Sequence, residues 1–448
     1  MSLSQQVFDA GIVGAGGAGF PTYKKLSSEV DLLVVNGAEC EPLLAADRYL
    51  MRVDAASVVA GIRAVMDACG IPRAVIGTKA HYAREIAALE EAIAACGADI
   101  PIHRLDSFYP AGDEQVLIYE ITGRTVPPGG IPLDLRIVVM NVATLGQVAA
   151  ATQGTPVTRR LVTVTGEVAS PTIVDAPIGT SAADLVAAAG GATTSPYVIV
   201  RGGPMMGHHH PMSAASTLGY GKADGGLIVL PASHPLVAFV GKPLERLLAE
   251  TKSMCIQCRM CTDLCPRYLI GHTMRPHRVM RTLQTGVDTE SLTDALLCCE
   301  CGICELYACP MGLSPRRMNI YAKGLLRAQG IGVTDKTVHV DQTSERDYRH
   351  IPQQRFIDRL QLSAYPTGID AFVRLEPEVV RLPTKHGVGV PARPCVAVGD
   401  RVELGAVVAE VTFGEVGAPV HASLAGRITE VGPDHITIQR TQHEGGAS

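Results

Sequence analysis

Apolar residues in the first 150 positions follow two patterns. Short, nearly continuous apolar runs predict strands at 31–36, 73–78, 100–105 and 136–141. Alanine-rich stretches around 53–68 and 81–95 instead repeat their apolar residues at helical spacing. Strands that alternate with helices in this way are typical of an α/β layer. We therefore predict an α/β domain over residues 1–150.

Beyond this domain the pattern changes three times. Residues 151–240 predict an α+β module of the β-grasp type, with short strands around one helix. Residues 241–335 are mostly helical in pattern, and we expect a helical linker over 336–370. Residues 371–448 return to short strands separated by glycine turns, which predicts a final β domain.

The stretch GAGGAGFPT at residues 14–22 carries the spacing G-x-G-x-x-G, which in a Rossmann fold places a pyrophosphate on a helix N-terminus. A Rossmann site would also use an acid about 20 residues later, where Glu39 stands. Pro21 argues against that fold, because a proline inside the helix after the glycines costs about 3 kcal/mol. We therefore predict a loop whose bare backbone admits a planar or phosphorylated ligand.

Composition narrows the class of protein. The 448 residues carry a net charge of −5. This charge gives no reason to expect nucleic acid as a partner, and the lack of long apolar runs predicts no transmembrane segment. The first residues lack the basic and apolar regions of a secretion signal, so we expect a cytoplasmic protein. Nine of the 13 cysteines lie between 255 and 309, and clustered thiols in a reducing compartment hold metal more often than they pair as disulfides.

The clustered cysteines form two runs with the spacing of bacterial 4Fe-4S ferredoxins, each ending in Cys-Pro. The first run is Cys255, Cys258, Cys261 and Cys265, and the second is Cys298, Cys301, Cys304 and Cys309. In two-cluster ferredoxins the fourth cysteine serves the other cluster, so we assign Cys309 to the first site and Cys265 to the second. The alternative is a pair of zinc sites, although zinc prefers separated C-x2-C pairs. Cys299 falls outside the spacing.

Several motifs resemble one group of flavoproteins. GAGGAGFPTYKKL, VVNGAECEP, YPAGDEQ and MNVATL are similar to the FMN- and NADH-binding module of the complex I flavin subunit and of the Rnf complex C subunit. The β-grasp stretch resembles their soluble-ligand-binding (SLBB) module. The last domain resembles a barrel-sandwich hybrid of the lipoyl type, without the lysine that a carrier modifies. In the Rnf subunit the corresponding domain lies at the N-terminus, whereas here it lies at the C-terminus. This order of parts, with both cysteine runs, resembles the cobalamin reductases of bacterial propanediol utilization, the PduS family.

The resemblance implies an FMN site in the first domain. The loop around the FMN phosphate and ring would be formed by Gly14, Gly16, Gly17 and Gly19, with Phe20 beside the nicotinamide path. The other implied contacts are Lys25 beside the flavin, Asn36 and Asn141 bonded to it, Glu41 as the acid at the hydride-transfer face, and Tyr109 and Asp113 on the nucleotide-facing loop. Ala38 and Met140 replace an aspartate and an asparagine of the complex I subunit, so flavin affinity or potential is expected to differ.

The resemblance also implies a function. An oxidoreductase of this family would pass electrons from NADH through FMN and two 4Fe-4S clusters to a corrinoid, and so reduce cob(III)alamin to cob(II)alamin or cob(I)alamin. Its implied partners are an adenosyltransferase and a shell protein of a bacterial microcompartment. Two alternatives stay open: an electron-transfer subunit of a larger complex without a corrinoid substrate, and a ligand-binding scaffold built on the β-grasp module.

Three further stretches are interpreted as structural parts of the chain without a role in catalysis. His208, His209 and His210 are expected in an exposed polar loop, with ligation of a corrin cobalt or another metal as the alternative. Met205 and Met206 are expected to pack under that loop. The mixed-charge stretch 344–359 is expected to face solvent.

Overall fold

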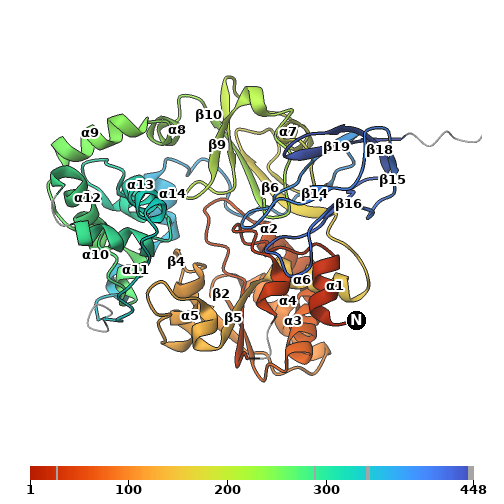
Figure 1. The fold of residues 1–448 in the computed structure, drawn as a ribbon, viewed down its shortest axis with the longest axis horizontal. Helices are drawn as coiled ribbons and strands as arrows, with labels where there is room; N and C mark the ends of the chain where they lie inside the picture. Colours follow the sequence, from red (N-terminus) through yellow and green to blue (C-terminus); the bar gives the residue numbers. More distant parts are fainter. Residues whose placement is uncertain (27–28, 287–288, 340–343, 442–448) are drawn as a thin grey trace, which may run out of the picture.

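The computed structural model describes residues 1–26, 29–286, 289–339 and 344–441. Figure 1 shows four parts: the first α/β domain, a β-grasp sheet beside it, a helical domain on one flank and a small β domain on the other. Of the helices in the described ranges, none is long and apolar enough to cross a membrane. The predicted multidomain α/β and α+β architecture is confirmed.

The first domain is a four-stranded parallel sheet in the order β3-β2-β1-β5. Its strands are β1 (Leu32–Asn36), β2 (Ala74–Lys79), β3 (Ile102–Leu105) and β5 (Ile137–Asn141). One face is covered by α1 (Leu3–Asp9), α2 (Ala46–Val53), α3 (Ala55–Cys69), α4 (Ala83–Ala95) and α6 (Val142–Thr152). The other face is covered by α5 (Glu114–Thr122). Because both faces are buried, the strands are nearly continuous apolar runs, and the strands and helices predicted here are confirmed.

The strand order reverses beside β1. The chain runs from β1 to β2 and β3 on one side, then returns to β5 on the other side. Asn36 and Asn141 end β1 and β5 and are paired in register. Ligands of open α/β sheets bind at the carboxyl ends of the strands, at such a switch point. The topology alone therefore marks the edge where these two asparagines lie.

The β-grasp module is a six-stranded sheet in the order β12-β7-β6-β10-β8-β9, with α7 (Ala182–Ala188) packed on it. Its strands are β6 (Arg159–Gly166), β7 (Thr172–Pro177), β8 (Tyr197–Arg201), β9 (His208–Pro211), β10 (Gly226–Pro231) and β12 (Phe372–Arg374). The three histidines are not in a loop as predicted, because they form the edge strand β9 against β8. Met205 is buried as predicted, whereas the prediction for Met206 is wrong, since it is 45% exposed.

The helical domain carries both cysteine runs. Its helices are α8 (Pro235–Val240), α9 (Leu244–Met254), α10 (Met260–Asp263), α11 (Pro266–Leu269), α12 (Pro276–Thr285) and α13 (Pro315–Ala328), with short turns η4 (Thr289–Leu297) and η5 (Cys304–Ala308). Proline begins α8, α11, α12 and α13, where its missing N–H would have no partner inside the helix. The proline after Cys265 therefore helps to start the helix beside that cysteine.

Residues 344–370 form a strap that returns from the helical domain to the first domain. Within it, β11 (Ile351–Pro352) pairs with β4 (Phe108–Tyr109), and helix is confined to α14 (Gln353–Arg359) and the turn η7 (Asp347–Arg349). Ile351 and Phe356 are buried, and the His350 ring stacks on Phe108 with centroids 3.8 Å apart. The prediction that 344–359 faces solvent is confirmed for nine of its residues, but it is wrong for Arg346, Ile351, Phe356 and Ile357, which are buried.

The final β domain is a sandwich of two sheets, ordered β13-β19-β18-β15 and β14-β16-β17. Its strands are β13 (Val379–Pro383), β14 (Arg393–Pro394), β15 (Arg401–Val402), β16 (Val407–Glu410), β17 (Val420–His421), β18 (Gly426–Val431) and β19 (His435–Arg440). The two glycine-turned halves, 396–411 and 418–431, each give one strand to each sheet. Their apolar residues meet between the sheets in one core.

Three parts meet at Lys222 of the β-grasp module. Its Nζ is fully buried and donates to the carbonyls of Gly11 in the first domain and Pro419 in the final domain, each at 2.7 Å. A Cβ at Gly11 would lie 2.6 Å from this Nζ, so glycine is needed there. Burial lowers the pKa of Lys222 to about 7. One side chain thus joins three parts of the molecule at once.

We expect Lys222→Met to flatten the dependence of stability on pH. The pKa of Lys222 is about 7 in the folded state and has its ordinary, higher value in the unfolded state. Between these two values only the unfolded state keeps the proton, so the free energy of unfolding rises by about 1.4 kcal/mol per pH unit. Urea unfolding at pH 7.5, 8.5 and 9.5 measures this slope. The exposed Lys336→Met is the matched control, and equal slopes in both variants would contradict the assignment.

Candidate functional site

The glycine loop lies at the switch point of the first domain. No helix follows the glycines, and a short turn, η1 (Thr22–Lys25), begins after Pro21, which confirms the predicted loop. Ala15 is held from two sides, by Thr144 Oγ1 at 2.9 Å from its N–H and by Arg160 Nη2 at 2.8 Å from its carbonyl. The loop is therefore anchored by the first domain and by the β-grasp module together.

The exposed part of the loop presents bare backbone. Gly16 and Gly17 are exposed, and their N–H groups have no hydrogen-bond partner within the described part of the chain. Gly17 has φ +111°, which L side chains rarely adopt, and a Cβ at Gly16 would lie 3.6 Å from Asn141 Cβ. Successive free N–H groups in such a loop bind anions, so this loop fits a phosphate.

Polar side chains surround this loop. Lys25 Nζ donates to the carbonyl of Val139 at 3.0 Å and lies 6.0 Å from the half-buried Phe20 ring. Asn36 Nδ2 donates to the Gly112 carbonyl at 2.9 Å, and Asn141 Nδ2 donates to Asp47 Oδ2 at 2.6 Å. Lys25 lies at the carboxyl end of β5 and also pairs with Glu114 at 3.8 Å. An ammonium suits a phosphate, and amides offer both a donor and an acceptor to a flat heterocycle. The residues present thus fit FMN.

Glu41 lies under a glycine-rich loop, residues 202–207, of the β-grasp module. Its Oε2 accepts from the Met205 N–H at 2.9 Å, while its Oε1 is buried with no partner among the described residues. Burial raises the pKa of Glu41 to about 7, and the N–H groups of the loop oppose that rise. An unpaired buried oxygen is costly, so Glu41 is placed to accept a hydrogen bond from a bound ligand.

Glu39 and Lys79 form a buried polar centre beside Glu41. Burial, with Asp47 nearby, raises the pKa of Glu39 to about 8. Lys79 Nζ donates to the Glu39 carbonyl at 2.8 Å and to Gln353 Oε1 of the strap at 2.7 Å, and burial lowers its pKa to about 8. The carboxyl end of β2 is therefore tied to the strap, an interaction for which the sequence offered no signal.

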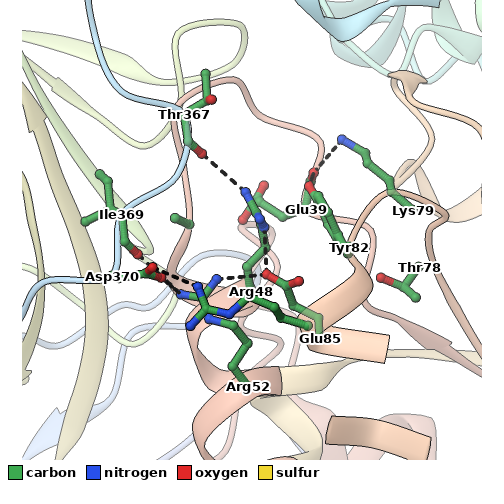
Figure 2. A network of polar contacts seen from close by, with 12 residues as sticks. Glu39, Arg48, Arg52, Thr78, Lys79, Tyr82, Glu85, Thr367, Ile369 and Asp370 are labelled. Atoms are coloured by element: carbon green, nitrogen blue, oxygen red, sulfur yellow. Dashed lines mark hydrogen bonds and ion pairs between the residues drawn. The ribbon is translucent and has the colours of Figure 1, made fainter. Parts of the chain in front are cut away.

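Arginines of α2 hold the far end of the strap (Figure 2). Arg48 Nε and Arg52 Nη1 both bind Glu85 Oε1, at 3.0 and 2.8 Å. Arg48 also donates to the Thr367 carbonyl at 3.3 Å, and Arg52 binds Asp370 at 2.6 Å. Glu85 of α4 is 2% exposed and holds both arginines in place, whereas their contacts with the strap at Thr367 and Asp370 lie at the surface.

The first set of cysteines lines a cavity near the tip of the helical domain. Cys255, Cys258, Cys261 and Cys309 all line this cavity, which is open to the surface. Gln257 Nε2 donates to Cys255 Sγ at 3.2 Å, and the Leu313 N–H donates to Cys309 Sγ at 3.4 Å. These are the four residues predicted for one site, and Cys309 comes from the second run. Their role as cluster ligands stays a prediction.

The second set lies deeper. Cys265 lies near Cys298, and Cys301 lies near Cys265 and Cys304. Burial raises the pKa of Cys265, Cys298 and Cys304, and a hydrogen bond with Cys299, followed by burial, raises that of Cys301. Cys299, outside the spacing, lies in the same set against Arg267. In the ranges described, no three His, Cys, Asp or Glu side chains stand close enough to chelate one ion. A cubane instead spreads its thiolates over four irons.

The two runs share a backbone conformation. The residues on either side of each middle cysteine have positive φ, namely Gln257 and Arg259 in the first run and Glu300 and Gly302 in the second. Left-handed residues next to right-handed ones turn successive N–H groups toward one point, which favours an anion. The Glu300 N–H donates to Cys298 Sγ at 3.4 Å. Both sets therefore fit the anionic thiolate cluster that the spacing predicts.

Tyr109 and Asp113 lie at the boundary with the helical domain. The buried Tyr109 hydroxyl donates to the Cys301 carbonyl at 2.7 Å. Asp113 caps α5 through Oδ1, and its Oδ2 binds Arg267 of α11 at 2.9 Å. Both residues thus connect the first domain to the deeper cysteine set. Their contact with a nucleotide, expected from the resemblance, stays a prediction.

Four family models match the chain. They describe a Nuo51 FMN-binding domain over residues 7–150, an SLBB domain over 161–208, a 4Fe-4S dicluster domain over 254–314 and an RnfC barrel sandwich hybrid domain over 372–444. The match at 254–314 favours iron–sulfur clusters over the zinc alternative. The order of the four matches agrees with the four parts of the structure.

Full-length relatives are known. The chain is 41% identical to the cobalamin reductase PduS of Salmonella typhimurium, over 98% of both chains. It is 40% identical to that of Citrobacter freundii, over 98% of this chain and 96% of the relative. It is also 34% identical to the C component of the Na(+)-translocating ferredoxin:NAD(+) oxidoreductase complex of Acetobacterium woodii, over 60% of this chain and 58% of that component.

A solved structure shares the fold. A chain of an NAD+-reducing [NiFe]-hydrogenase in the H2-reduced state aligns with a TM-score of 0.51 at 22% identity. The alignment covers 75% of this chain and 63% of the hydrogenase chain. At this level of identity the likeness concerns the fold alone.

We expect Gly203→Ala to lower stability by about 1–3 kcal/mol, the usual effect of overpacking. A Cβ at Gly203 would lie 2.1 Å from Glu41 Oε2, so the loop at 202–207 or the carboxylate must move. Thermal unfolding measures the change. Gly324→Ala is the control, because a Cβ there meets no atom within 4 Å inside helix α13, and that variant should gain about 0.5–1 kcal/mol. A Gly203→Ala protein as stable as the wild type would contradict the close packing.

Proposed function

We propose a function from one premise: the chain belongs to the family of the cobalamin reductase PduS. It is accordingly an oxidoreductase, an iron–sulfur flavoprotein with an FMN-binding domain and a 4Fe-4S dicluster domain. The proposal is that it takes electrons from NADH and delivers them to a corrinoid, so that cob(III)alamin is reduced to cob(II)alamin and onward to cob(I)alamin. Bound FMN would supply the conversion of a hydride into single electrons, and the clusters carry one electron each.

The first domain supplies the groups that would bind FMN. The free N–H groups of Gly16 and Gly17 and the Lys25 ammonium would hold the phosphate, beside the carboxyl ends of the parallel strands. Asn36 and Asn141 end β1 and β5 and would orient the ring by its polar edge. Gly14 and Gly19 would complete the loop around FMN, with Phe20 beside the nicotinamide path.

Glu41 is the residue that we propose to act at the hydride-transfer face. Its carboxyl titrates near neutral pH because it is buried, and one oxygen is held by the Met205 N–H. The free oxygen is then available to hold a proton or to accept a hydrogen bond from the nicotinamide amide. The loop over it, residues 202–207, keeps water from this side of the site.

One observation carries the proposal: the deeper cysteine set is joined directly to the first domain. The Tyr109–Cys301 hydrogen bond and the Asp113–Arg267 ion pair connect that set to the loop at residues 109–113. The carbonyl of Gly112 in this loop accepts a hydrogen bond from Asn36. A cluster in this set would therefore lie next in line after the flavin site. Cys304 is also within electrostatic reach of Cys261, which supports a short step to the first set.

An anaerobic spectroscopic assay tests the proposal. Protein loaded with iron, sulfide and FMN is mixed with NADH and hydroxocobalamin, and visible spectra follow flavin, clusters and corrinoid together. Catalytic formation of cob(II)alamin is expected. If NADH bleaches flavin and clusters while the corrinoid stays unchanged, the chain is an electron-transfer component without a corrinoid substrate, like its relative in the ferredoxin:NAD(+) oxidoreductase complex.

The remaining elements of the proposal concern location and partners. Family membership supports a place in propanediol utilization, with an adenosyltransferase that uses the reduced corrinoid and a microcompartment shell protein as partners. Each of these two proteins is expressed separately with the chain, and co-purification tests each interaction on its own. His208, His209 and His210 enter no step of the proposed path.

We expect Glu41→Gln to lower the rate of NADH oxidation with ferricyanide by about 10- to 100-fold while FMN stays bound. A carboxyl with a pKa about 7 changes its charge between pH 6 and 8, so the wild-type rate should change in that window. The variant should show no such change. Glu403→Gln, on the exposed surface of the final domain, is the control. An unaltered pH profile in the Glu41 variant would remove this residue from the reaction.

Single cysteine variants should separate the two clusters. Cys261→Ala should lose the cluster of the first set, Cys265→Ala that of the deeper set, and each should lose about four irons per chain. Flavin content should be unchanged in both. Iron analysis, flavin fluorescence and electron paramagnetic resonance spectra of the reduced proteins measure these contents. Joint loss of iron and flavin would show that the domains do not hold their cofactors independently.

A further inference from the structure

The two cysteine sets differ in their access to the surface. In the deeper set Cys265, Cys301 and Cys304 are buried and Cys298 is half-buried. In the first set Cys258 is exposed, and the cavity that it lines is bounded by Ile256, Pro310 and Met311. An electron that enters from the first domain thus reaches the outside of the protein at the first set.

Exposed apolar residues form a collar at this exit: Ile256 and Met311 line the cavity, and Met254 and Met260 flank the first cysteines in the sequence. We define the collar by its exposed members, which are Met254 at 40%, Ile256 at 62%, Met260 at 44% and Met311 at 36% exposure. Soluble proteins rarely expose contiguous apolar groups unless they bind something there. Methionine is typical of surfaces that adapt to a partner, because its side chain is flexible and polarizable.

The rim of the collar is basic. Residues 251–285 contain six basic residues and one acid, although the whole chain has a net charge of −5. Two of the six are paired inside the protein, Arg267 with Asp113 and Arg275 with Asp294, and Arg259 is paired at the surface with Asp263. The four others are exposed: Lys252, Arg259, Arg278 and Arg281. A partner that meets this rim is favoured when it carries negative charge.

We propose that the collar docks a protein electron acceptor whose face has an apolar centre and an acidic rim. The proposal rests on the proposed function, because it requires that reducing equivalents reach the first cysteine set. One electron leaves this set and enters the acceptor bound on it. An apolar centre within a charged rim is the usual anatomy of a protein interface.

Two other occupants fit the surface less well. A free corrinoid would need a concave site that encloses it, whereas the cavity at this place is lined by the four thiols together with Ile256 and Met311 of the collar. A docked protein that carries the corrinoid fits both this surface and the proposed function. A second copy of the chain bound symmetrically would place each basic rim against itself, since a two-fold contact pairs the same patch. Like charges so opposed disfavour that dimer.

The test uses oxidised flavodoxin as the acidic probe and cytochrome c as the basic one. The holoprotein is reduced with dithionite, so the test does not depend on NADH. Stopped-flow mixing then measures the electron-transfer rate, and calorimetry with the oxidised proteins measures binding without turnover. We expect flavodoxin to bind and react faster than cytochrome c, with a rate that falls as salt is raised.

The variants Ile256→Glu and Met311→Glu should weaken flavodoxin binding and its reduction at least tenfold. Reduction of ferricyanide, which needs no docking surface, should be unchanged. Val398→Glu, at a residue 64% exposed on the final domain, is the matched control. Iron content and circular dichroism show whether each variant is folded and loaded.

Several outcomes would overturn the proposal. These are flavodoxin binding unchanged by both variants, a rate independent of salt, or hydroxocobalamin reduction that slows in the variants while flavodoxin reduction does not. Dimers in the wild type that dissociate in Ile256→Glu would assign the collar to a second copy. If NADH fails to reduce the protein but dithionite-reduced protein still reacts as expected, the proposed donor is wrong and the docking surface stands.

Discussion

The buried ion pair between Asp113 and Arg267 holds the two halves of the electron path together. Asp113 caps helix α5 of the FMN-binding domain, and Arg267 belongs to α11, which begins directly after Cys265. Loss of Asp113 would leave the Arg267 guanidinium with Cys299 as its remaining partner, so the cost is lower than for a fully buried unpaired charge, which is about 3–5 kcal/mol. Because electron transfer depends steeply on distance, the fixed contact at this boundary is a condition for every other part of the site to work.

Much of the fold is encoded locally and was therefore predictable. Strand runs such as 31–36 and helices such as α3 follow from apolar periodicity, and the loop at residues 14–19 follows from Pro21. The cysteine runs were recognisable because ligand spacing is a local property of the chain. Local reasoning failed where a polar stretch joins an existing surface. The three histidines extend the β-grasp sheet as β9, and within the largely exposed stretch 344–359 the side chains of Ile351 and Phe356 are buried.

The contacts that shape the candidate site come from distant segments and have no sequence signature. Glu41 was expected from the resemblance, but its cover at 202–207 was not, and only the glycines of that loop hinted at a close approach. Lys79 and Lys222 bind backbone carbonyls, acceptors that every residue offers. Such partners are settled by packing of whole domains, so no pattern along the chain identifies them.

The strap also sets the order in which the protein can be completed. The FMN-binding domain leaves the ribosome first, yet its Lys79 bonds Gln353, and Gly19 packs against the carbonyl of His386 so closely that neither it nor Gly387 has room for a side chain. At ordinary rates of translation these later segments emerge roughly 10 to 50 s after residue 150. During that interval the glycine loop and Lys79 lack these contacts. The loop proposed for the flavin is thus packed only after segments more than 200 residues further along the chain have been made.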